Sequence, residues 1–157
     1  MEISIRSLVL ATILALGSLA QSVSFADDMA SIATGGYATG LRTMEMMHMI
    51  DANKDGKVSR DEWIAFQERV FAGLDKDKSG FLEVAEFYGS PSDANAFATA
   101  AYARGLRTQE MFGKIDANGD GKVSRDEFMS YQTKIFDMMD KGKKQELGIA
   151  DFIVKTH

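Results

Sequence analysis

A twelve-residue stretch from Asp51 to Glu62, reading DANKDGKVSRDE, constrains this chain more than any other segment. Oxygen-bearing side chains stand at its first, third and fifth positions, a glycine stands sixth, and a glutamate closes it at the twelfth. Calcium takes about six to eight oxygen ligands, and a short loop supplies them when alternate side chains converge and the chain then turns sharply. Gly56 permits that turn, because a residue without Cβ reaches positive φ easily. The stretch therefore predicts a calcium-binding loop, whose ligands are Asp51, Asn53, Asp55, the backbone carbonyl of Lys57, and Glu62.

The same pattern recurs twice further along the chain. Residues 116–127 read DANGDGKVSRDE and repeat all the key positions, and residues 75–86 read DKDKSGFLEVAE. In the latter stretch Ser79 takes the fifth position with a hydroxyl oxygen, and Glu83 at the ninth is a further candidate, directly or through water. Asp, Asn and Gly also dominate ordinary surface turns, but two matches with the same internal spacing favour metal loops. The predicted ligands are Asp75, Asp77, Ser79, the carbonyl of Phe81, and Glu86, and then Asp116, Asn118, Asp120, the carbonyl of Lys122, and Glu127.

A repeat of 65 residues organises the chain around these loops. The segment that begins at Tyr37, YATGLRT, returns at Tyr102 as YARGLRT, and Asp51 has its counterpart at Asp116. Apolar residues recur at helical spacing on both sides of the first loop. A repeat of this fidelity predicts two copies of one supersecondary unit.

The repeat also places a fourth stretch, residues 140–151, where the metal pattern fails. It reads DKGKKQELGIAD, so that Gly142 replaces the third-position oxygen, Lys144 the fifth, and Gln145 the turn glycine. A loop with these replacements cannot gather six oxygens around a dication. Leu147 keeps the apolar eighth position, which indicates a loop retained for strand pairing. We therefore expect three calcium ions for the chain.

The first 26 residues have the layout of a secretory signal peptide. Arg6 precedes an apolar run over residues 8–16, and small residues at Ser24 and Ala26 stand before a plausible cleavage point ahead of Asp27. The run is shorter than the roughly 20 apolar residues of a membrane-spanning helix. We therefore expect a periplasmic or secreted protein that begins at Asp27, with membrane attachment only if this segment stays uncleaved.

Composition narrows the functional classes further. The net charge of −5 argues against nucleic acid as a partner. The absence of cysteine excludes disulfides, thiol catalysis and thiolate metal sites. The chain has two histidines, no nucleophile motif and no glycine-rich phosphate loop, and its best-placed carboxylates are already assigned as metal ligands. An enzyme is therefore not expected.

Helix–loop–helix units with acidic twelve-residue loops resemble the EF-hand superfamily, and the resemblance covers residues 41–157. It implies an all-α fold of two EF-hand pairs, with calcium as ligand and short β pairing between the loops of each pair. The layout looks like calmodulin with one degenerate loop, and the signal peptide makes it look like a bacterial exported EF-hand protein. The implied strand partners are Val58 with Leu82 and Val123 with Leu147. The implied division is 1–26 signal peptide, 27–40 linker or weak helix, 41–88 first EF-hand pair, 89–98 linker, and 99–157 second EF-hand pair.

An alternative function rests on a cluster of methionines before the first loop. Met44, Met47 and His48 lie at i, i+3 and i+4 of a predicted helix, and thioethers select Cu(I), which suggests a periplasmic copper carrier. The repeat aligns Met47 with Phe112, which instead indicates a core position. Methionines are also suited to an adaptable surface for a protein partner. The sequence thus predicts an exported calcium-binding protein that acts as a sensor, a buffer or a calcium-stabilised adaptor.

Overall fold

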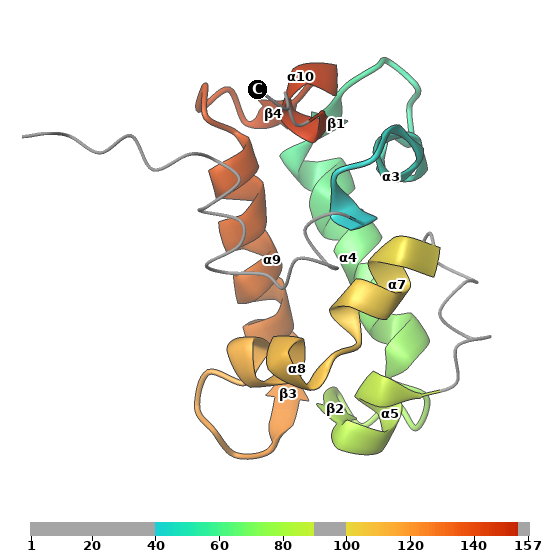
Figure 1. The fold of residues 1–157 in the computed structure, drawn as a ribbon, viewed down its shortest axis with the longest axis vertical. Coiled ribbons are helices and arrows are strands. Elements are labelled where there is room, and N and C mark those ends of the chain that lie inside the picture. Colours follow the sequence, from blue (N-terminus) through green and yellow to red (C-terminus); the bar gives the residue numbers. More distant parts are fainter. Residues whose placement is uncertain (1–39, 90–99, 154–157) are drawn as a thin grey trace, which may run out of the picture.

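The computed structural model describes residues 40–89 and 100–153, so the predicted signal peptide lies outside the described residues. The helices shown in Figure 1 are α3 (Met44–Ile50), α4 (Arg60–Leu74), α5 (Val84–Tyr88), α7 (Ala100–Leu106), α8 (Gln109–Ile115), α9 (Arg125–Met139) and α10 (Ile149–Phe152). The strands are β1 (Val58–Ser59), β2 (Phe81–Glu83), β3 (Lys122–Ser124) and β4 (Glu146–Leu147). In the part of the chain that the structure describes, every helix is too short or too polar to cross a membrane.

Two helices of 15 residues each, α4 and α9, form the centre of the fold. Each begins with a capping box, in which the N-cap serine hydroxyl accepts a hydrogen bond from the backbone N–H of a glutamate three residues later. The glutamate carboxylate in turn accepts a hydrogen bond from the serine N–H at 2.9 Å. The pairs are Ser59 with Glu62 and Ser124 with Glu127. The predicted closing glutamates of the first and third loops therefore also fix where the central helices start.

The central helices lie side by side and run in opposite directions (Figure 1). Near the start of α4, the Trp63 indole donates a hydrogen bond to the carbonyl of Gln132 at 3.0 Å and meets the ring of Phe136 edge-on at 5.8 Å. Near the end of α4, Phe71 meets Phe128 at 5.5 Å, close to the start of α9. Each end of one helix is thus held by buried aromatic contacts to the opposite end of the other.

The strand pairing differs from the sequence prediction. Strand β1 pairs with β4, with Val58 opposite Leu147, and β2 pairs with β3, with Leu82 opposite Val123. The predicted pairs Val58–Leu82 and Val123–Leu147 are therefore wrong. We name residues 51–62 loop 1, residues 75–86 loop 2, residues 116–127 loop 3 and residues 140–151 loop 4. Loop 1 is paired with loop 4, and loop 2 with loop 3.

The length of α4 explains this exchange of partners. A helix of 15 residues is about 22 Å long, and α4 fills the whole interval between loops 1 and 2. These loops therefore lie at opposite ends of the molecule, and α9 separates loops 3 and 4 in the same way (Figure 1). The fold is mainly helical with short two-stranded pairings between loops, as predicted, although each pair combines loops from different halves of the chain.

One cluster of buried side chains extends along the central helices from one loop pair to the other. Its largest fully buried members are Trp63, Tyr102, Phe66, Phe87, Phe128, Phe136 and Phe152. The eighth-position residues of all four loops are also fully buried within it. The loop pairs are thereby connected to each other through packed side chains as well as through the helices.

Candidate metal centres

Loop 1 folds around two carboxylates that accept hydrogen bonds from its own backbone. Asp51 accepts from the N–H groups of Asp55 at 3.2 Å and Gly56 at 3.0 Å. Glu62 reaches back from α4 and accepts from the N–H groups of Ala52 at 3.0 Å and Asn53 at 3.1 Å. The first and twelfth positions are therefore drawn toward the same turn of chain, as the sequence predicted for a loop that closes around a cation.

Loop 3 repeats this geometry almost bond for bond. Asp116 accepts from the N–H of Gly121 at 3.0 Å, and Glu127 accepts from Ala117 and Asn118 at 3.1 and 3.2 Å. In both loops the third-position asparagine donates from its amide nitrogen to the fifth-position aspartate at 3.0 Å. The structure thus brings the predicted side-chain ligands of loops 1 and 3 into equivalent arrangements.

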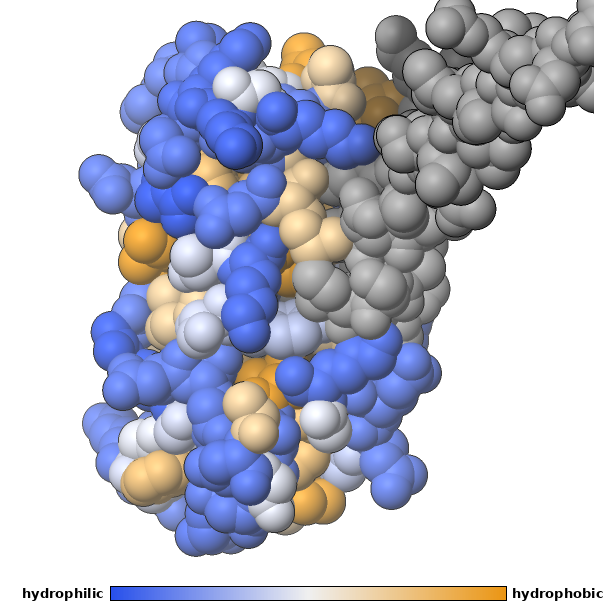
Figure 2. Space-filling model, turned by 90° about the vertical axis from the view of Figure 1, so that its left-hand side faces the viewer, coloured by the Kyte–Doolittle hydropathy of each residue, from blue (hydrophilic) through white to orange (hydrophobic). Residues whose placement is uncertain are grey.

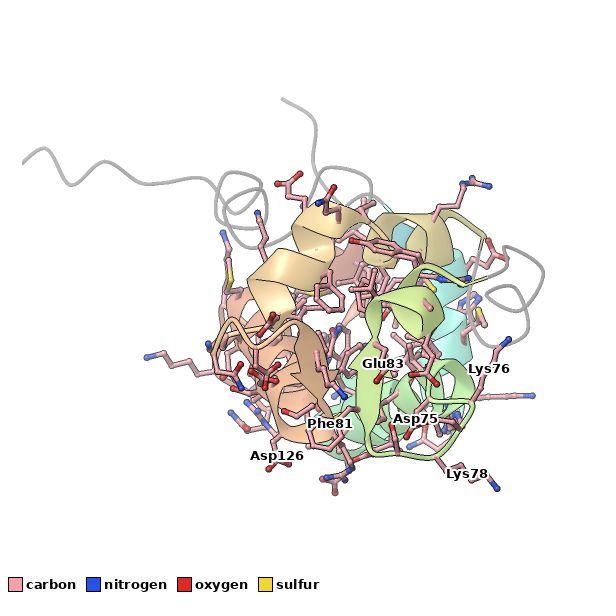
Figure 3. The ribbon with its side chains drawn as sticks, turned by 90° about the horizontal axis from the view of Figure 1, so that it is seen from below. Asp75, Lys76, Lys78, Phe81, Glu83 and Asp126 are labelled. Carbon is pink, nitrogen blue, oxygen red and sulfur yellow. The ribbon has the colours of Figure 1, made fainter. Side chains whose placement is uncertain are left out.

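Loop 2 gathers its acidic side chains most closely. One carboxylate oxygen from each of Asp75, Asp77 and Glu86 lies within 4.8 Å of the others, and among the described residues this is the only such cluster of three acidic or histidine side chains. Figure 3 shows Asp75 and Glu83 on this loop, with the side chains of Lys76 and Lys78 directed outward. The predicted fifth-position ligand, Ser79, donates from its hydroxyl to the carbonyl of Phe81, the predicted seventh-position ligand, at 3.0 Å.

All four loops share one backbone conformation. The residue at the sixth position has positive φ throughout, and the three glycines there have φ values between 81° and 83°. The fourth position is also left-handed in every loop. The residues with this conformation are Lys54, Gly56, Lys78, Gly80, Gly119, Gly121, Lys143 and Gln145.

Loop 4 keeps this conformation without the ligand set. Asp140 accepts from the N–H groups of Lys144 at 3.0 Å and Gln145 at 2.7 Å, just as the first aspartate does in the other loops. A Cβ built on Gly142 would lie 3.1 Å from Cε of Lys144, so the lysine stem fills the space beside the third position. The side chain of Gln145 accepts a hydrogen bond from Nε of Arg60, in loop 1, at 2.6 Å. Loop 4 therefore supports loop 1, where the sequence had predicted support for loop 3.

The hydrogen bonds inside loops 1 and 3 favour the ionised form of their closing glutamates. Backbone and hydroxyl donation from Ser59, together with the N–H groups of Asn53 and Ala52, lowers the pKa of Glu62. Burial by itself raises the pKa of Glu127, but the combined hydrogen bonds from its loop outweigh that effect and lower it. The pKa of Asp77 is lowered chiefly by hydrogen bonding to Ser79. The folded loops therefore stabilise these three side chains in their ionised forms.

Two lysines within the loops form side-chain ion pairs that the sequence motif did not predict. Lys57 lies 2.8 Å from Glu146 across the pairing of loops 1 and 4, and Lys122 lies 3.0 Å from Glu83 across the pairing of loops 2 and 3. Both were predicted to contribute only a backbone carbonyl. Their ion pairs depend on which loops are neighbours, so sequence spacing alone gave no signal for them.

The methionine cluster before loop 1 does not form an exposed ligand set. Met47 is fully buried in the core, Met44 is partly buried, and His48 is exposed. Met46, Met111 and Met139 are also buried. The face of the molecule in Figure 2 is largely hydrophilic, with small separate apolar patches. In this structure the methionines of the described residues serve mainly as core residues, and a Met-rich partner surface is not evident among them.

The fold and the loops together define a class of domain in which paired helix–loop–helix units present oxygen-lined twelve-residue loops. Comparison with known families agrees with this geometry. Residues 65–133 match the family described as an EF-hand domain pair, and residues 44–67 match the family described as EF hand. The domain-pair match encloses loops 2 and 3, which are the loops that pair through β2 and β3. Residues 44–133 of the chain therefore carry EF-hand domains.

A curated relative provides a more distant comparison. The chain is 26% identical over 102 residues to "Calcium-binding protein A" of Dictyostelium discoideum. The alignment covers 57% of this chain and 65% of the relative's length. The similarity therefore extends beyond a single loop but leaves about a third of the relative unmatched.

Proposed function

We propose that this protein binds calcium ions, one in each of loops 1, 2 and 3. The observation that carries the proposal is the cluster of Asp75, Asp77 and Glu86, whose carboxylate oxygens lie within 4.8 Å of one another. Like charges at this separation repel, and a divalent cation between them converts that repulsion into attraction. Loops 1 and 3 hold their corresponding side chains on the same pattern of hydrogen bonds, and the similarity to a calcium-binding protein is consistent with this activity.

The donor set favours calcium over other metals. Side-chain oxygens at positions one, three and five, a carbonyl at seven and both oxygens of the closing glutamate supply about six ligands, and a bidentate carboxylate suits calcium better than the smaller magnesium. Soft metals such as Cu(I) select sulfur ligands, and Met47 is withdrawn into the core. The structure therefore offers more support for a calcium protein than for the alternative copper carrier.

We further propose that the protein acts in the periplasm or outside the cell, because residues 1–26 have the layout of a signal peptide. Extracellular calcium modules bind with dissociation constants of about 10⁻⁴–10⁻³ M, and sensors bind more tightly. N-terminal sequencing of the protein recovered from its native compartment tests this proposal. We expect a chain that starts at Asp27, and an intact leader on a cytoplasmic protein would contradict it.

Sensor, buffer and adaptor roles differ in what calcium does to the core. A sensor opens its helix pairs and exposes apolar residues on binding, whereas a buffer or a calcium-stabilised adaptor stays closed. Fluorescence of an apolar dye, measured with and without calcium, separates these roles. We favour the closed roles, because α4 and α9 each connect two loop pairs and an opening at one end would disturb aromatic contacts along both helices.

Isothermal titration of four variants tests calcium binding directly. The closing-glutamate variants Glu62→Gln, Glu86→Gln and Glu127→Gln should each weaken or abolish calcium binding at the loop that carries the substitution. Asp151→Asn is the matched control, because it changes the twelfth position of loop 4 and keeps an oxygen to accept the hydrogen bond from Gly148 at 2.8 Å. If the unaltered protein gives no heat of calcium binding, or if Asp151→Asn loses a site, the assignment is contradicted.

A further inference from the structure

Both loop pairs contain a lysine that reaches across the paired strands to an acid of the opposite loop. Strand register brings Lys122 opposite Glu83 in the pairing of β2 with β3, and the Nζ–Oε1 distance is 3.0 Å. In the other pair, the Nζ of Lys57 lies 2.8 Å from Oε1 of Glu146. Each lysine occupies the seventh position of its loop, where the proposed metal ligand is the backbone carbonyl. The side chain can therefore change without removing a ligand.

The two acids differ in the kind of loop to which they belong. Glu83 stands at the ninth position of loop 2, which has a full ligand set and could use that carboxylate directly or through water. Glu146 belongs to loop 4, which lacks oxygen side chains at its third and fifth positions. The ion pair of Lys122 consequently joins two candidate calcium loops, whereas the ion pair of Lys57 joins one candidate calcium loop to loop 4.

The surroundings of the Lys122 ammonium group are acidic on both sides. The hydrogen bond to Glu83 is the main cause of its raised pKa, and the charges of Asp120 in loop 3 and Asp77 in loop 2 add to it. The charge of Lys122 in turn contributes to the lowered pKa of Asp77. The side chain is half exposed, so it remains charged at neutral pH. Its single positive charge therefore interacts with proposed ligands of both loops, Asp77 in loop 2 and Asp120 in loop 3.

We propose that Lys122 is an internal counter-charge that competes with calcium at loops 2 and 3 and thereby sets their affinity. This inference rests on the proposed calcium sites. Before calcium binds, the ammonium group offsets the mutual repulsion of the two acidic loops. After two ions bind, the same group faces four added positive charges, and its pair with Glu83 draws that carboxylate away from an ion in loop 2. Both effects weaken calcium binding relative to a chain without the charge.

Substitution of Lys122 by Met removes the charge and retains an unbranched side chain on the strand. In a Glu62→Gln background, which leaves loops 2 and 3 as the calcium sites, we expect Lys122→Met to tighten binding of the two ions by about threefold to tenfold at low salt, the size expected when a single positive charge is removed from the neighbourhood of a dication in a water-like dielectric. The gain should shrink toward unity near 1 M salt, where the screening length is about 3 Å. Lys57→Met in the same background is the matched control and should leave both affinities unchanged.

The controls separate failure of this inference from failure of the proposed function. If the Glu62→Gln parent binds no calcium, the calcium assignment of loops 2 and 3 is wrong. If the parent binds two ions and Lys122→Met binds them equally well at low salt, the role of Lys122 is wrong. A gain of the same size at low and high salt would also overturn it, because a packing effect is not screened. The melting temperature of Lys122→Met shows whether that variant is stable. If it is unstable, Lys122→Gln provides a second uncharged variant.

Discussion

At the scale of single residues, the closing glutamates perform two tasks. Glu62 accepts hydrogen bonds from Ser59 at the start of α4 and from Ala52 and Asn53 at the start of loop 1. Glu127 does the same at the start of α9 and loop 3. Each carboxylate thus ties a helix to its loop, so that a cation bound by the loop also acts on the helix.

The neighbour of Glu62 provides an optical test of this connection. Trp63 is buried and bonded to Gln132 in α9, so movement of the first turn of α4 changes the environment of the indole. We expect calcium to change the fluorescence of Trp63 and Glu62→Gln to remove most of that change. Glu127→Gln, at the equivalent residue of α9, is the control and should preserve it. A signal that persists in Glu62→Gln would show that the indole responds to another site.

Loop 4 tests whether the ligand set alone distinguishes a metal loop from a structural one. Its backbone already has the shared conformation, including a φ of 62° at Gln145. The triple variant Gly142→Asp, Lys144→Asp and Gln145→Gly supplies the missing oxygens, removes the lysine stem beside position 142 and places glycine at the left-handed turn. We expect it to bind one more calcium ion than the unaltered chain by titration. An unchanged number of ions would mean that the loop lacks more than ligands.

At the scale of elements, the lengths of α4 and α9 decide which loops meet. A single helix fills the interval between loops 1 and 2, and another fills the interval between loops 3 and 4. The connection between loops 2 and 3 is longer, so these two loops can lie together at one end of the molecule. Loops 1 and 4 then meet at the opposite end. Two candidate calcium loops therefore share one strand pairing, while loop 1 is paired with the loop that lacks ligands.

This arrangement predicts which sites influence each other. Loops 2 and 3 exchange backbone hydrogen bonds through β2 and β3, so Glu86→Gln should weaken calcium binding at loop 3 several-fold while loop 1 changes little. In a calcium titration, the fluorescence of Trp63 reports binding at loop 1, and the total heat reports binding at all sites. Comparison of the two signals separates the effect on loop 3 from the effect on loop 1. A larger effect on loop 1 than on loop 3 would indicate coupling along α4 instead of across the strands.

The same elements show how far the sequence could be interpreted. The spacing of the acidic loop residues, the turn glycines and the helix starts are local features of the sequence, and the helical fold with short strand pairings was predicted correctly. The partners Val58–Leu82 and Val123–Leu147 were wrong, because pairing depends on tertiary distance and a neighbour in sequence need not be a neighbour in space. The twelve residues between Glu62 and Asp75, with helical apolar spacing throughout, were the signal that these loops are held apart.

At the scale of the whole molecule, one buried cluster joins the two ends. Acidic side chains are concentrated at the loops, where they repel one another without cations. A ligand that binds only the folded state stabilises it by about 2.7 kcal/mol at one hundred times its dissociation constant. We therefore expect a clearly higher melting temperature in calcium than in chelator, with magnesium less effective. Equal melting temperatures in calcium and chelator would argue against cation binding by the folded state.

The number of bound ions tests the central claim most directly. Native mass spectrometry of the protein, recorded at increasing calcium concentration, resolves each bound ion as a separate mass. Loops 1, 2 and 3 should fill to give a final species with three calcium ions, and Glu62→Gln should give a final species with two. A species with four ions at moderate calcium, or a chain that remains free of calcium throughout, would contradict the account.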